Sequence, residues 1–97
     1  MVARGSEMKL EPKRVTVRDQ RSRWGSASRG GTLSFSWRLV LCPPEILDYV
    51  VVHELAHLRW AGHGVRFWTL VGRYAPGWEH HRRWLRRNES RLRHVLD

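Results

Sequence analysis

The chain has 97 residues, a single cysteine at position 42 and a net charge of +9, carried by sixteen arginines and two lysines. A chain of this length forms one domain, and one cysteine excludes an internal disulfide. No apolar run approaches the about 20 residues of a membrane span and no secretory leader is evident, so we expect a cytoplasmic protein without a membrane partner.

The N-terminal part is expected to hold a flexible arm and then the start of a sheet. Residues 1–13 show little pattern, so we assign them to a loose arm and assign residues 14–97 to a single domain. Val15, Thr16 and Val17 alternate as in a short strand.

A hairpin is predicted next. Residues 23–27 and 32–37 flank Ser28-Arg29-Gly30-Gly31, a sequence typical of a turn. In the second segment, apolar residues at every other position alternate with serines. This pattern predicts a half-buried antiparallel strand.

Three helices should follow, over residues 44–60, 65–74 and 78–96. The first begins with Pro44-Glu45, which suits a first helical turn, and it is apolar almost all round. We therefore expect it to be the central buried helix. Strands followed by helices predict an α+β domain, in which a small antiparallel sheet packs on this helix and two further helices follow.

The most informative motif is His53-Glu54-Leu55-Ala56-His57, followed by His63. Histidines four residues apart on a helix point the same way and can bind one ion, and the next turn can return His63 to them. Glu54 is badly placed as a ligand but well placed to hold a water beside the ion. The motif predicts one catalytic zinc ion per chain, with His53, His57 and His63 as ligands and Glu54 as the general base.

Some roles stay open. Glu79 is an alternative third ligand, although three histidines at this close spacing are the simpler set. Tyr49, Tyr74 and Arg73 are candidates to stabilise the oxyanion, as is His81, for which a place in the core or behind a ligand is favoured. The substrate is expected to be a peptide or protein that adds to an open sheet edge beside the zinc.

The basic charge gathers on the last helix. Its exposed face is predicted to carry five arginines, which are Arg82, Arg83, Arg86, Arg87 and Arg93. Such a face is either a solvated surface or a nucleic-acid tether for a peptidase that acts on nucleic-acid-associated proteins. The alternative function is a basic nucleic-acid-binding module whose zinc is structural, although three histidines beside a glutamate favour an open catalytic site.

Several segments together resemble the YgjP-like metallopeptidases, which are related to the SprT-like and Wss1-like zincins. They are Arg23-Trp24-Gly25-Ser26, residues 37–45, residues 48–58 with the histidine motif, His63, Phe67-Trp68 and Trp84-Leu85. The resemblance implies a minimal zincin-like fold and a zinc-dependent hydrolase, with zinc held by His53, His57 and His63 and with Glu54 as the catalytic acid and base.

Overall fold

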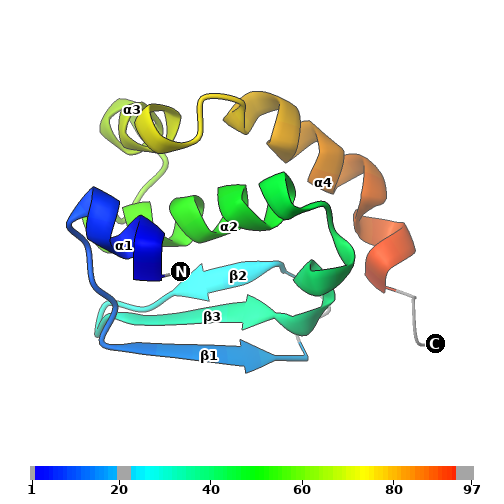
Figure 1. Cartoon of the computed structure of the whole chain (residues 1–97), viewed down its shortest axis with the longest axis horizontal. Helices are drawn as coiled ribbons and strands as arrows, with labels where there is room; N and C mark the ends of the chain where they lie inside the picture. The colour runs from blue at the N-terminus through cyan, green and yellow to red at the C-terminus, as the bar shows by residue number, and fades with distance from the viewer. Residues whose placement is uncertain (1, 20–22, 94–97) are drawn as a thin grey trace.

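The structure is a computed structural model that describes residues 2–19 and 23–93, with side chains described for residues 4–19 and 23–91. The sheet lies along one side of a central helix, and two further helices lie on the other side of that helix (Figure 1). The elements in chain order are α1 (Val2–Met8), β1 (Arg14–Arg18), β2 (Gly25–Ala27), β3 (Thr32–Ser36), the 3-10 helix η1 (Trp37–Leu41), α2 (Pro44–Ala56), α3 (Val65–Tyr74) and α4 (Trp78–Arg93). This arrangement confirms the expected α+β class.

The three strands form one sheet in the order β1-β3-β2. β2 pairs antiparallel with β3 through the predicted hairpin, with Gly25 opposite Phe35. β1 pairs with β3 in parallel, with Arg14 opposite Thr32, so the prediction of a wholly antiparallel sheet was wrong for this strand. The alternation of side chains defines the two faces of a strand but not its direction. Here the direction follows from the path of the chain. After β1 the chain reverses and forms β2 at the far edge of the sheet, and the hairpin then reverses it again into β3 between the two.

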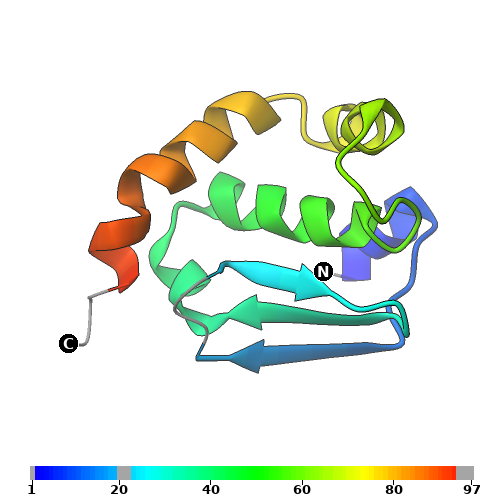
Figure 2. The same ribbon diagram turned by 180° about the vertical axis from the view of Figure 1, so that it is seen from behind.

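Helix α2 is the buried centre of the fold, as predicted. Val52, Leu55 and Ala56 are fully buried, and β2 contacts α2 on the sheet side. Figure 2 shows α3 and α4 on the side of α2 away from the strands. The core therefore surrounds the helix that carries His53 and Glu54 and is capped by His57, which fixes the positions of these residues.

The N-terminal segment differs from the expected loose arm, because residues 2–8 form α1 and contact α2. Arg4 donates two hydrogen bonds to the carboxylate of Asp48, from Nε at 2.8 Å and from Nη2 at 2.7 Å. The Tyr74 hydroxyl donates to the Glu7 carbonyl at 3.1 Å, and Met8 is buried. These contacts join residues far apart in the sequence, so local pattern does not predict them.

Two element ends also differ from the expectation. β3 ends at Ser36, whose side chain accepts a hydrogen bond from the Arg38 main-chain N–H as η1 begins. α2 ends at Ala56 instead of residue 60, since the chain tightens there into bonds such as Leu58 N–H to the Leu55 carbonyl. No helix in residues 2–19 and 23–93 is long and apolar enough to cross a membrane.

Candidate metal centre and substrate cleft

Three histidines converge at the C-terminal end of α2. His53 comes from α2, His57 is the C-cap residue of α2, and His63 comes from the turn before α3. One ring nitrogen of each lies within 4.8 Å of the other two. Nε2 of His57 lies 3.1 Å from Nε2 of His63. Tetrahedral zinc with Zn–N bonds of 2.0–2.1 Å would place two such nitrogens about 3.3 Å apart. The three side chains therefore fit a zinc ion.

Hydrogen bonds orient two of these rings. Nδ1 of His57 donates to the Trp60 carbonyl at 3.0 Å, which directs Nε2 towards His63. Nδ1 of His53 lies 3.3 Å from the Tyr49 hydroxyl, one helical turn earlier on α2. Both contacts turn the Nε2 side of the ring towards the shared centre.

Helix α3 holds the three rings from one side. The ring centroid of Phe67 lies 5.0, 4.3 and 5.0 Å from those of His53, His57 and His63. Trp68 also contacts the cluster and stacks on His63 at 5.8 Å. Phe67 is 1% exposed, so it is a rigid support for the three imidazoles.

The surroundings favour the neutral form of His53 and His63. Burial, followed by the neighbouring His57 and His63, lowers the pKa of His53 to about 3. Burial and His57 also lower the pKa of His63. A neutral imidazole is the form that binds a metal, so these shifts favour metal binding at neutral pH.

Glu54 lies beside the histidines but outside their cluster. It is 6% exposed, and burial raises the pKa of its carboxyl to about 7, although the positive charge of Arg23 lowers it. Gly25 on β2 faces it closely: a Cβ built at residue 25 would lie 3.2 Å from Glu54 Oε2. The carboxyl group is thus held between α2 and the edge of the sheet, with a pKa suited to accepting and releasing a proton near pH 7.

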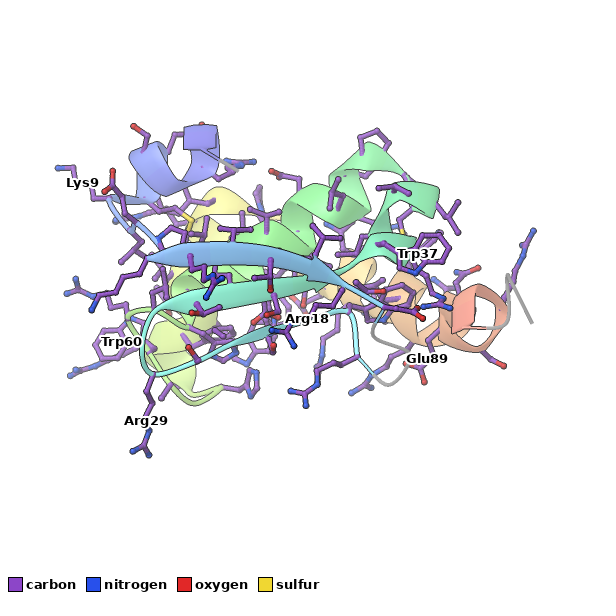
Figure 3. The ribbon with its side chains drawn as sticks, turned by 90° about the horizontal axis from the view of Figure 1, so that it is seen from below. Lys9, Arg18, Arg29, Trp37, Trp60 and Glu89 are labelled. Atoms are coloured by element: carbon purple, nitrogen blue, oxygen red, sulfur yellow. The ribbon has the colours of Figure 1, made fainter. Side chains whose placement is uncertain are left out.

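An open cleft of about 330 Å³ runs between β2 and the histidines. β2 forms one edge of the sheet. Trp24 and Ser28 make the main-chain hydrogen bonds to β3, so the antiparallel alternation turns the N–H and C=O groups of Gly25 and Ala27 away from it. These groups offer main-chain partners to an extended peptide. Figure 3 shows Arg29 projecting from the turn at one end of the cleft that it lines.

A sequence model of the YgjP-like family, described as its metallopeptidase domain, matches residues 3–88. The chain belongs to the YgjP-like family. The crystal structure of the metallopeptidase zymogen of Pyrococcus abyssi abylysin is similar to it, with a TM-score of 0.76 and 23% identity over 94% of this chain and 90% of that chain. At this identity the similarity shows the fold alone. No curated protein matches the chain.

Membership of the YgjP-like family confirms the resemblance noted in the sequence, and it makes the chain a metallopeptidase and therefore a hydrolase. It implies a metal, typically zinc. Within the described part of the chain, the three histidines have the spacing to hold such an ion.

Three candidates for stabilising the oxyanion, Tyr74, Arg73 and His81, do not line the cleft of this YgjP-like chain. Tyr74 donates to the Glu7 carbonyl in α1, and Arg73 lies beside Trp60 and Arg66 in a separate hollow. His81 is absent from the cleft lining and lies behind Tyr49, with ring centroids 6.0 Å apart. The side chain of Glu79 is exposed and outside the histidine cluster, so it does not replace His63.

The arginines of α4 divide into two sets. All four described arginines of the predicted basic face are exposed, but Arg82 and Arg86 line a hollow beside Glu54, whereas Arg83 and Arg87 are absent from its lining. The side chain of Arg93 lies outside the described residues. The sequence reasoning placed all five on one face and missed Arg23 and Gly25 beside Glu54. Both belong to the Arg-Trp-Gly-Ser segment, and that segment was a signal that β2 contributes to the site.

Proposed function

We propose that the chain is a zinc-dependent peptidase in which His53, His57 and His63 hold one ion and Glu54 transfers the proton. The observation that carries this proposal is the convergence of three imidazoles beside one buried carboxyl group, in a cleft bordered by a strand edge. The cluster has three ligands and opens to a cleft, which suits a catalytic zinc site better than a closed structural one.

Zinc in such a site lowers the pKa of a water towards about 7 and polarises a carbonyl group. The residues of the chain supply the rest. The Glu54 carboxylate accepts a proton from the attacking water and donates it to the leaving amine, and its burial, which raises its pKa in the metal-free chain, makes it a stronger base. The outward main-chain groups of Gly25 and Ala27 align the peptide as an added strand.

The test compares the intact chain with Glu54→Gln. Each is loaded with zinc, analysed for metal content and mixed with a fluorescently labelled unfolded protein. The wild-type chain should bind about one zinc ion and release labelled fragments. Glu54→Gln should keep the zinc and lose at least about 100-fold in cleavage rate, because it removes the proton acceptor and no ligand.

Glu45→Gln is the matched control, because Glu45 is an exposed glutamate in the first turn of the same helix. It should retain full activity. Equal cleavage by wild type and Glu54→Gln would refute the role of Glu54, and a zinc-loaded wild-type chain that cleaves nothing would refute the peptidase.

A further part of the proposal is that the substrates are nucleic-acid-associated proteins. It is supported by the net charge of +9 and by Arg83 and Arg87, which are exposed and absent from the linings of the cleft and of the hollow beside Glu54. An exposed basic surface attracts polyanions through their phosphates. The same surface supports the alternative of a nucleic-acid-binding module with a structural zinc, which the cleavage assay distinguishes.

A further inference from the structure

A second hollow, of about 300 Å³, adjoins the histidine cleft. The two share Arg23, Gly25, His53 and Glu54 in their linings, so they are continuous past the Glu54 carboxyl group. Figure 3 places Arg29, which lines the first hollow, and Glu89, which lines the second, at opposite ends of the molecule. A peptide that lies along β2 therefore passes Glu54. A side chain or chain end next to the scissile bond is then directed into this second hollow.

The walls of the second hollow are mainly apolar. Tyr49, Val50 and Leu85 line it and are at most 7% exposed, and Trp24 adds an aromatic surface. The Tyr49 hydroxyl is already in contact with His53. The volume is at the lower end of the range for ligand pockets, which suits a single side chain or chain end.

The charges around this hollow are predominantly positive. Arg82 and Arg86 line it from α4, one helical turn apart, and the Arg82 guanidinium also lies over the Trp68 ring, 5.4 Å from its centroid. Arg23 lines it as well and acts electrostatically on Glu54. Against these three arginines, Glu89 and Glu54 are the acidic residues in the lining. All three arginines are exposed, so water weakens their pairing with a carboxylate, but the planar guanidinium groups match a carboxylate in shape and the apolar walls lie beside them.

We infer that the second hollow binds a carboxylate of the substrate peptide next to the scissile bond, with Arg82 and Arg86 as its partners. This inference rests on the proposed peptidase function for the position of the substrate. The carboxylate belongs either to an acidic side chain or to the C-terminus of the peptide. The chain thereby selects bonds that lie next to an acidic residue or near a peptide end.

The first experiment profiles cleavage sites. The zinc-loaded chain digests an unfolded protein, and mass spectrometry identifies the residues that flank each cleaved bond. Glutamate and aspartate should be enriched about 3- to 10-fold at one position, or cleavage should concentrate near C-termini. Arg86→Glu should abolish the enrichment and favour lysine or arginine at that position. Arg91→Glu, an equal charge change at an exposed residue of the same helix outside the lining, should leave the profile unchanged.

The second experiment measures binding without turnover. Zinc-loaded Glu54→Gln is titrated with labelled peptides that carry glutamate, glutamine or leucine at the selected position, each with a free or an amidated C-terminus. Fluorescence anisotropy should give a Kd about 3- to 10-fold lower for the peptide that carries the recognised carboxylate. Comparison of the free and amidated series shows whether the recognised carboxylate is a side chain or the C-terminus. Arg86→Glu should remove the difference in Kd.

Equal affinity for glutamate, glutamine and leucine peptides with free and with amidated ends would overturn the inference, as would tighter binding of leucine. Cleavage without side-chain or end preference would overturn it while leaving the peptidase intact. A wild-type chain that cleaves nothing would instead refute the proposed function, and the binding series would still decide what the hollow accepts.

Discussion

Gly25 on β2 faces Glu54 on α2 so closely that a Cβ at residue 25 would lie 3.2 Å from both Cγ and Oε2 of the glutamate. The edge strand and the carboxyl group are thus in contact, so the side chain at residue 25 determines where the carboxyl group can lie. A Cβ here would also lie 3.1 Å from the Ser34 carbonyl, a main-chain atom of the neighbouring strand that cannot easily move.

Gly25→Ala should therefore displace Glu54. We expect kcat to fall by about 10-fold, because a small misplacement of a reacting group lowers the rate steeply, while zinc content is retained. Gly62→Ala is the matched control, since a Cβ there meets nothing within 4 Å. Steady-state kinetics and metal analysis of the two variants check this prediction, and equal kcat values for Gly25→Ala and wild type would contradict it.

His63→Ala should weaken zinc binding by more than about 100-fold. Loss of a ligand costs more than the 10- to 100-fold that follows loss of a group hydrogen-bonded to a ligand. Glu79→Ala should leave the affinity unchanged, because the Glu79 side chain is exposed and outside the histidine cluster. Competition titrations against a coloured chelator measure both constants. The assignment fails if the two results are reversed.

Burial of Glu54 should make the metal-free chain less stable at neutral and higher pH than at acidic pH. Folding raises the pKa of this carboxyl from 4.5 to about 7, so between these values the unfolded chain releases a proton that the folded chain keeps. The free energy of unfolding should then fall as pH rises through this range, by on the order of 3 kcal/mol in total.

Glu54→Gln lacks this titration and should not show the fall. His53 has the opposite effect, since its lowered pKa makes stability fall as pH drops from 6.5 to about 3, but both chains share it. Denaturant unfolding of the two metal-free chains at pH 5 and pH 8 isolates Glu54. Parallel changes in the two chains would contradict the raised pKa.

The sequence predicted the histidine cluster because its geometry is local. His53 on α2 and His57 at its C-cap lie one helical turn apart, and one turn of chain returns His63 to them. Contacts between distant segments were not predictable in this way. Arg4 meets Asp48 across 44 positions, and this contact docks α1 on α2. Tyr74 likewise donates to the Glu7 carbonyl, in a segment far away in the sequence. Its hydroxyl, which the sequence made a candidate to stabilise the oxyanion, therefore lies outside the cleft.

Arg83 and Arg87 are the candidates for binding nucleic acid through α4. Both are exposed on α4 and lie outside the linings of the two hollows beside Glu54, so the pair Arg83→Ser and Arg87→Ser should preserve folding, zinc content and peptide cleavage. If these arginines contact phosphates, the logarithm of the binding constant for duplex DNA should fall linearly with the logarithm of the salt concentration, and each lost contact should reduce the slope by about 0.9.

The matched control is the pair Arg14→Ser and Arg18→Ser, which removes the same charge from exposed positions of β1. Fluorescence anisotropy over a range of salt concentrations gives the slopes. A smaller slope for the α4 pair alone assigns the contacts to that helix, because a general effect of net charge would change both pairs equally. Binding that is insensitive to salt and to both pairs would mean that these arginines are only a solvated surface.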